Sequence, residues 1–229
     1  MYDLGIVGGM GSKATVEIFD RIIAMTEATN DSEHMKIIIL NNSNIPDRTD
    51  NILYGDKSPI NEINKTINDI RKIGARNIII ACNTAHYYVD DLDFSGMNFI
   101  SIVDTALKCL FNNYKNKKII ILGTRGIIKT NIFLNNIYSK NLDLNYLDYK
   151  KQKLLQEIIY QIKSGINPLT LLDKFIDLLE DKDSIYLLAC TELSLFKNCL
   201  ANYILVDSMD CLVKEVIIKA GYKLRDVFK

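Results

Sequence analysis

The sequence predicts an α/β protein of two similar lobes, each a four-stranded, mainly parallel sheet flanked by helices, with the active site in the cleft between them. Three observations lead to this fold class. Short apolar runs alternate with amphipathic helical stripes along the chain. The order of these elements in the first half repeats in the second. A cysteine in a near-twin context, residues 80–84 and 188–192, follows the third expected strand of each half.

In the first half, four apolar runs are expected to form strands, at residues 4–7, 36–40, 77–81 and 98–103. Phe19, Ile22 and Ile23 indicate a helix between the first two strands. Isoleucines spaced by three and four residues predict a clear amphipathic helix over 60–73, which Gly74 ends. Because strands and helices alternate, right-handed crossovers between parallel strands follow.

The second half repeats this order, with strands expected at 118–122, 144–147, 184–189 and 203–206. Apolar stripes predict helices over 154–162 and 172–179. A last stripe over 209–220 predicts a helix that packs back on the first lobe. We therefore expect one lobe from residues 1–103 plus 208–229 and the other from residues 104–207.

Composition excludes several classes of protein. Lys plus Arg and Asp plus Glu both number 28, so no net charge attracts nucleic acid or an acidic membrane. No apolar run is long enough to span a bilayer and the N-terminus lacks a basic secretory start, so we expect a cytoplasmic protein. Five cysteines without close Cys-x-x-Cys spacing favour neither a disulfide scaffold nor a zinc site. Cys109, Cys199 and Cys211 receive no role.

The glycine-rich loop after the first strand can be interpreted in three ways. Gly9-x-Gly11-x-x-Ala14 formally satisfies a dinucleotide fingerprint, but asparagines replace the acid expected after the second strand. The loop can instead bring backbone N–H groups to a carboxylate at a helix N-terminus, or be a tight turn alone. We expect no nicotinamide or flavin.

Arg48 and the two cysteines are the candidate reactive residues. Arg48 stands in a polar loop after the second strand, where it is either a solvated surface charge or a bidentate fork for a carboxylate. Cys82 and Cys190 are either core thiols or a pair that faces one cavity, because ligands bind at the carboxyl ends of parallel strands. His86 leaves open a Cys-His hydrolase, although the second half has no counterpart. Polar neighbours are placed to hydrogen-bond the substrate or the sulfurs: Asn83, Thr84, Thr191 and Glu192.

Four motifs in order resemble the aspartate/glutamate racemase family, and most of all its aspartate racemase branch. They are residues 5–11 (GIVGGMG), 45–48 (IPDR), 81–86 (ACNTAH) and 189–193 (ACTEL). The resemblance covers essentially the whole chain. It implies two α/β lobes, usually a homodimer, and a cofactor-free racemase without a metal. It also implies a small-molecule amino-acid substrate, with no nucleic acid or membrane as partner.

The resemblance also implies roles for individual residues. Cys82 and Cys190 become the acid/base pair on either side of the substrate's α-carbon. Arg48 and Lys163 become the cations that bind its carboxylates. The remaining matched positions line the cavity: Met10, Asn83, Thr84, Thr124 and Thr191. Ser12 and Ile127 depart from the family pattern, which commonly has proline and threonine there.

The resemblance favours L- and D-aspartate as substrates, because the Asp-Ser and Cys-Thr-His features of glutamate racemases are replaced by Gly8-Gly9 and Cys190-Thr191-Glu192. Other readings stay open. One is a glutamate or broad-specificity racemase. A second is an isomerase or decarboxylase of the same scaffold, such as a maleate isomerase or an arylmalonate decarboxylase. A third is a non-enzymatic metabolite-binding protein, which would keep the cations and have no need of two thiols.

Overall fold

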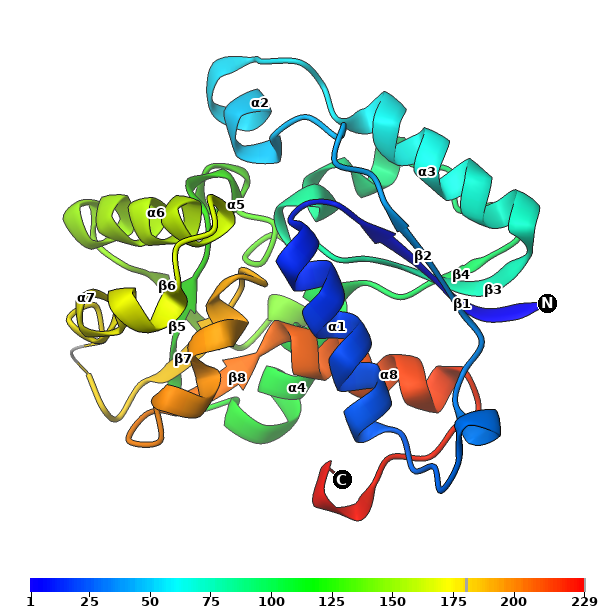
Figure 1. The fold of residues 1–229 in the computed structure, drawn as a ribbon. Coiled ribbons are helices and arrows are strands. Elements are labelled where there is room, and N and C mark those ends of the chain that lie inside the picture. Colours follow the sequence, from blue (N-terminus) through cyan, green and yellow to red (C-terminus); the bar gives the residue numbers. More distant parts are fainter. Residues whose placement is uncertain (180, 229) are drawn as a thin grey trace.

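A computed structural model describes residues 1–179 and 181–228 and contains two parallel four-stranded sheets, as the sequence predicts (Figure 1). The strand order is β2-β1-β3-β4 in the first sheet and β6-β5-β7-β8 in the second, so the two sheets have the same topology. The strands are β1 (Tyr2–Gly8), β2 (Ile37–Asn41), β3 (Ala75–Ile80), β4 (Asn98–Phe99), β5 (Lys118–Leu122), β6 (Asp143–Tyr146), β7 (Ile185–Leu188) and β8 (Ile204–Asp207).

Among the described residues, seven α-helices lie between strands, and an eighth, α8, follows the last strand. They are α1 (Ser12–Met25), α2 (Arg48–Tyr54), α3 (Ile60–Ile73), α4 (Ile102–Tyr114), α5 (Arg125–Thr130), α6 (Tyr149–Lys163), α7 (Leu172–Ile176) and α8 (Ser208–Lys219). The helix over 60–73 is confirmed, and Gly74 ends it in a left-handed conformation. No helix in the described residues is both long and apolar enough to cross a bilayer.

The strand residues alternate between a shared central core and two outer cores. In β7, Ile185 and Leu187 point into the central core, whereas Tyr186 and Leu188 point into the outer core beneath α6 and α7. The first sheet behaves likewise, with α3 on its outer face. Helices α1, α4 and α8 lie between the sheets (Figure 1). Helix α8 packs against both α1 and α4.

Four expectations about individual elements are wrong in part. The strand expected over 98–103 ends at Phe99, because the Ser101 side chain caps α4 by accepting a hydrogen bond from the Asp104 N–H. Arg48, which was expected in a polar loop, is the first residue of α2. The helix expected over 172–179 is the short α7, which follows a 3₁₀ turn and ends at Ile176. Phe19 and Ile23 are partly exposed, while the buried face of α1 carries Ile18 and Ile22.

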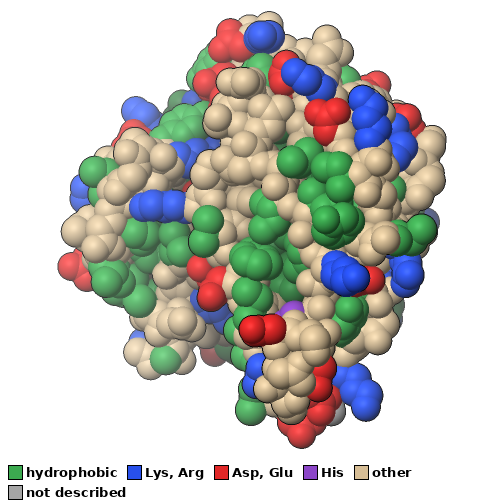
Figure 2. Space-filling view, turned by 45° about the vertical axis from the view of Figure 1, so that its right-hand side comes forward, with side chains coloured by type: hydrophobic (Ala, Val, Ile, Leu, Met, Phe, Trp, Pro, Cys, Tyr) green, Lys and Arg blue, Asp and Glu red, His purple; other side chains and the backbone are tan. Residues whose placement is uncertain are grey.

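The surface also has an apolar region. Figure 2 shows hydrophobic side chains gathered in a band through the middle of one face, with charged side chains mainly toward the edges. Exposed single hydrophobic residues are normal in soluble proteins, whereas a contiguous group of them is typical of an interaction surface.

Candidate active site

The two sheets carry their cysteines at equivalent positions. Ile80, the last residue of β3, is paired with Val7, and Leu188, the last residue of β7, is paired with Leu122. Cys82 and Cys190 follow these ends by two residues each and are 7% and 5% exposed. Both are free thiols. Each cysteine therefore stands at the carboxyl end of a central parallel strand, where ligands of α/β proteins bind.

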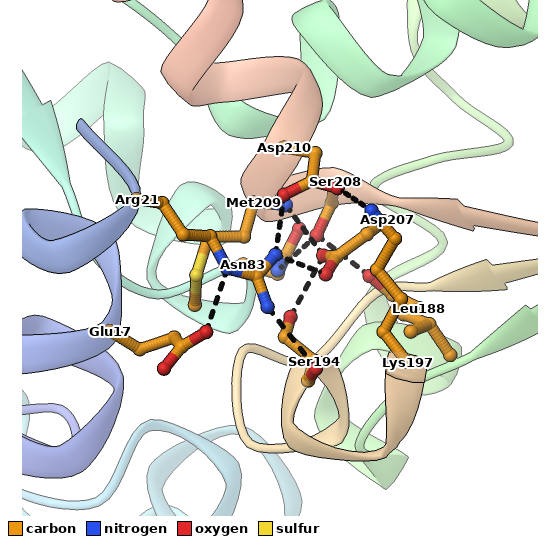
Figure 3. A network of polar contacts seen from close by, with 10 residues as sticks. All are labelled: Glu17, Arg21, Asn83, Leu188, Ser194, Lys197, Asp207, Ser208, Met209 and Asp210. Carbon is orange, nitrogen blue, oxygen red and sulfur yellow. Dashed lines mark hydrogen bonds and ion pairs between the residues drawn. The ribbon is translucent and has the colours of Figure 1, made fainter. Parts of the chain in front are cut away.

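One hydroxyl ties the two cysteine loops together. The Asn83 side-chain amide donates to the Ser208 Oγ over 3.1 Å, and the Ser208 hydroxyl donates to the Leu188 carbonyl over 2.7 Å (Figure 3). Asn83 follows Cys82 directly and Leu188 precedes Cys190 by two residues. The Asn83 Oδ1 is buried without a hydrogen-bond partner among the described residues, so it is available to a donor such as an ammonium group.

The Arg48 guanidinium is held by backbone carbonyl groups. It donates to the carbonyl oxygens of Met10 (2.9 Å), Pro46 (3.0 Å) and Ile45 (3.4 Å). A guanidinium has five N–H donors, and the Nε here is buried without a partner within the described part of the chain. Burial alone would lower the pKa of Arg48, but the Cys82 sulfur and the Asp47 carboxylate raise it. The guanidinium thus keeps an unused buried donor, Nε, that could bind a carboxylate.

Lys163 reaches the same region from the second sheet. It ends α6, and its Nζ lies 3.7 Å from an Asp47 carboxylate oxygen. Burial alone would lower the pKa of Lys163, but Glu192 raises it, and so do Cys190 and Asp47, while Arg48 opposes them. Asp47 is at the same time the N-cap of α2, since its side chain accepts from the N–H groups of Thr49 and Asp50. One acid therefore places both cations.

Glu192 is the nearest charged partner of Cys190. The Cys190 thiol donates to a Glu192 carboxylate oxygen over 3.0 Å, and the Thr191 hydroxyl lies 3.4 Å from the same oxygen. Burial and the adjacent Glu192 carboxylate raise the pKa of Cys190 well above its usual value, while Lys163 opposes them. In the other cysteine loop, the hydroxyl groups of Thr84 and Thr124 lie 2.9 Å apart. The Thr84–Thr124 contact joins a loop of the first sheet to a loop of the second.

The glycine-rich loop lets the backbone pass close to its neighbours. Gly9 has φ +92°, and a Cβ there would lie 2.3 Å from the Asn42 carbonyl oxygen. A Cβ on Gly11, the N-cap of α1, would lie 3.3 Å from a Glu192 carboxylate oxygen. The loop therefore places the N-terminus of α1 beside the Glu192 carboxylate.

His86 is a structural partner of the first cysteine loop. Its Nε2 accepts from the Ile102 N–H (3.2 Å), so the ring proton is on Nδ1, which donates to the Cys82 carbonyl (2.9 Å). Burial lowers the pKa of His86 to about 4. Because both ring nitrogens bind backbone groups, neither can take a proton from the Cys82 sulfur. This geometry argues against the Cys-His hydrolase.

The structure links all nine residues assigned to the site through direct contacts or shared neighbours. The sequence reading missed Asp47 and Ser208. Asp47 had a recognisable signal, an aspartate one residue before a helix, whereas Ser208 reaches the site only through the packing of α8 on both lobes. Of the two departures, Ile127 is fully buried in the central core, and Ser12 accepts a hydrogen bond from Asn41 at the exposed start of α1.

Comparison with known proteins gives a consistent result. The profile of the family described as Asp/Glu/Hydantoin racemase matches residues 7–216. A broad specificity amino-acid racemase, RacX of Bacillus subtilis (strain 168), is 25% identical over 228 residues, which is 93% of this chain and 96% of that protein. A glutamate racemase of Sulfurihydrogenibium sp. (strain YO3AOP1) is 30% identical over 125 residues, 53% of this chain and 48% of that protein. The structure of Picrophilus torridus aspartate racemase superposes with a TM-score of 0.89 at 27% identity, covering 98% of this chain and 96% of that chain.

Proposed function

Because the chain belongs to the Asp/Glu/Hydantoin racemase family, we propose that it is a cofactor-independent racemase that interconverts L- and D-aspartate with Cys82 and Cys190. One observation carries the proposal. The two cysteines follow equivalent strands of two equivalent sheets, and each faces a charged partner, Arg48 or Glu192, inside one buried polar cluster. A core thiol has no need of such a partner.

The chemistry requires removal of the α-proton from one face of the substrate and its return on the other. The Cα–H bond breaks as a thiolate takes the proton, and the opposite thiol gives its own proton to the same carbon. Arg48 and Lys163 neutralise the two carboxylates of aspartate, which lowers the energy of the developing carbanion. The free Oδ1 of Asn83 can accept a hydrogen bond from the substrate ammonium group.

The direct test uses purified protein and single enantiomers of aspartate, glutamate and several neutral amino acids, in deuterium oxide and without pyridoxal phosphate. We expect loss of optical rotation and entry of deuterium at the α-carbon of aspartate. We expect kcat/KM to favour aspartate over glutamate by roughly 10-fold or more, since one methylene contributes about 1–3 kcal/mol to discrimination. Absence of both signals with every amino acid would refute the activity.

The two-cysteine mechanism is tested separately. Cys82→Ala and Cys190→Ala are each expected to reduce racemisation to background, because in each variant one face of the α-carbon lacks its proton carrier. Circular dichroism should show that the fold is intact. Cys199→Ala is the matched control, since Cys199 is exposed and is not part of the cluster. Near wild-type turnover by either site variant would remove that cysteine from the mechanism.

A racemase of broad specificity is the second candidate, favoured by the similarity to the Bacillus subtilis protein along nearly the whole chain. Comparable kcat/KM values for aspartate and several neutral amino acids would support a racemase of broad specificity. Maleate and arylmalonates belong in the same substrate panel, because the isomerase and decarboxylase readings predict turnover of these acids instead.

We also infer that the protein forms a homodimer, as the family resemblance implies. The apolar band in Figure 2 offers a surface of the right kind, because homodimer interfaces are more apolar than the rest of a protein surface. Light scattering coupled to gel filtration measures the mass directly, and a mass near 26.1 kDa, that of one chain, would contradict the dimer.

A further inference from the structure

The two cysteine loops differ in a way that makes the thiols chemically unequal. The residue two positions after the cysteine is Thr84 in the first half and Glu192 in the second. Thr84 makes a neutral contact with Thr124, whereas Glu192 accepts a hydrogen bond from the thiol of its own loop. Two loops on the same scaffold therefore place different charges beside their sulfurs.

Glu192 is built into the site. The residue is 4% exposed, and one carboxylate oxygen is occupied by Cys190 while the other, Oε1, has no hydrogen-bond partner among the described residues. A buried carboxylate oxygen without a partner is costly, so its presence indicates a role beyond packing. With one oxygen fixed on the thiol, this carboxylate stabilises the sulfur only while the sulfur keeps its proton.

The groups that face the two sulfurs have opposite charge. Cys190 faces the Glu192 carboxylate, with Lys163 as the opposing cation. Cys82 faces the Arg48 guanidinium. The phenol of Tyr88 lies on the same side, and His86 contacts only the Cys82 carbonyl group from behind. A guanidinium stabilises a thiolate, and a carboxylate destabilises one.

We propose that Glu192 holds Cys190 as the thiol, which gives the site a polarity with its acid at Cys190. The catalytic meaning of this polarity rests on the proposed racemase function. In one direction the Cys82 thiolate takes the α-proton, and the Cys190 S–H bond breaks as its proton joins the carbon. The protein is then left with a Cys190 thiolate beside Glu192, and a proton must move from Cys82 to Cys190 before the resting form returns.

The polarity is tested without substrate by measuring how fast iodoacetamide alkylates each cysteine as a function of pH, with each peptide quantified by mass spectrometry. Only the thiolate reacts, so the pH of the inflection reports ionisation of the thiol even where the reagent enters slowly. We expect the Cys190 inflection to lie well above the usual thiol value of about 8.5. In Glu192→Gln, which keeps the size and an acceptor but removes the charge, the Cys190 inflection should fall by about one pH unit or more. A fall of one pH unit corresponds to a roughly 10-fold higher rate of Cys190 alkylation at pH 8.

The matched control is Glu157→Gln, which removes an exposed carboxylate from α6, the helix that also carries Lys163. It should leave both inflections unchanged. In racemisation assays, Glu192→Gln should move the alkaline limb of the kcat/KM profile to lower pH and leave the acid limb in place, because the alkaline limb reports loss of the Cys190 proton. A purely structural Glu192 would reduce the rate equally at all pH values.

Failure of the polarity and failure of the proposed function give different results. If the inflection of wild-type Cys190 lies at or below the usual thiol value of about 8.5, the polarity is wrong, whatever the variants do. If Glu192→Gln folds and leaves the Cys190 inflection unchanged while racemisation is normal, the role of Glu192 is wrong and the function stands. If the inflections behave as expected but no amino acid is racemised, the polarity stands and the function is wrong.

Discussion

At the scale of single residues, Arg48 and Lys163 differ in how rigidly they are held. Arg48 donates to backbone carbonyl groups on both sides of its guanidinium, whereas Lys163 has one carboxylate at 3.7 Å. Only the first geometry fixes a planar fork, and a lysine ammonium in its place would lose the bidentate contact. The two cations are therefore unequal, and substitutions at Arg48 should be the more sensitive.

Arg48→Ala and Lys163→Ala are each expected to lower kcat/KM for aspartate by about 1.5–3 kcal/mol, or roughly 10- to 150-fold, the range for a lost hydrogen bond to a charged group. Arg48→Lys should recover little of the loss. Steady-state kinetics measure this, with Arg76→Ala as the control, because Arg76 is exposed on β3. Unchanged kinetics with aspartate in both site variants would show that the carboxylates bind elsewhere.

His86 should make the stability of the fold depend on pH. Its pKa is lowered by burial from 6.5 to about 4, so the unfolded chain binds a proton more readily than the folded one. Stability is therefore complete above about pH 6.5 and is lost as the pH falls toward 4, by on the order of 3 kcal/mol. Urea titrations at pH 7 and pH 4.5 should show a smaller loss in His86→Gln than in the wild type.

The other histidine provides the control for this experiment. His34 is partly exposed, and His34→Gln should keep the wild-type pH dependence. Equal pH dependence in wild type and His86→Gln would mean that carboxylates alone cause the loss of stability in acid.

At the scale of secondary-structure elements, the sequence predicted the sheets better than the helices. Buried parallel strands leave an unambiguous apolar run, and helix α3 has isoleucines on one face only, so both were identified correctly. Helix α2 was missed because it has one turn on each side of Asn51 and carries functional polar residues instead of an apolar stripe. In β4, apolar residues continue from the strand into α4, and nothing but the Ser101 cap marks the change.

The candidate site shows the same division. Residues that follow strand ends, such as Cys82, Cys190 and Arg48, can be found from the order of elements. The hydrogen bonds through Ser208 cannot be found in this way, since they depend on how α8 packs between the sheets. Ile127, a departure from the family pattern, packs into the central core while its N–H donates to the Thr124 hydroxyl.

The turn after β1 should tolerate no side chain at Gly9. Gly9→Ala forces a Cβ to within 2.3 Å of the Asn42 carbonyl oxygen at a positive φ. The control Gly96→Ala has a similar φ of +77° but open space around its Cβ, so it reports the backbone strain alone. In urea unfolding, the loss of unfolding free energy should be larger for Gly9→Ala than for Gly96→Ala by about 1 kcal/mol or more. Equal losses would show that the loop moves to accommodate the methyl group.

At the scale of the whole molecule, a buried ionic network joins the two halves. Arg21 on α1 contacts Asp207 at 2.5 Å and Asp210 at 2.6 Å, at the start of α8, and the Ser194 carbonyl at 3.2 Å (Figure 3). Lys197 pairs with Asp210 from the other side. The Asp207 side chain is fully buried, and burial raises its pKa although Arg21 opposes this.

Arg21→Met should destabilise the protein by on the order of 3–5 kcal/mol, because it leaves buried Asp207 without its cation. Lys219→Met is the control, since the Lys219–Glu215 pair is exposed and such pairs contribute little. Urea unfolding measures both. A double variant, Arg21→Met with Asp207→Asn, should recover part of the loss of stability. If Arg21→Met alone lost no more stability than the control, Asp207 would be protonated in the native state.

The central core has a consequence for how such a protein can evolve. Its side chains come from both sheets and from α1, α4 and α8, so neither half of the chain possesses a complete apolar interior. A half taken from a relative by recombination would meet a surface shaped by a different partner, and its mismatched volumes would cost stability. The two halves look like interchangeable modules in their strand order, yet sequence changes on one side of this core constrain those that the other side can accept.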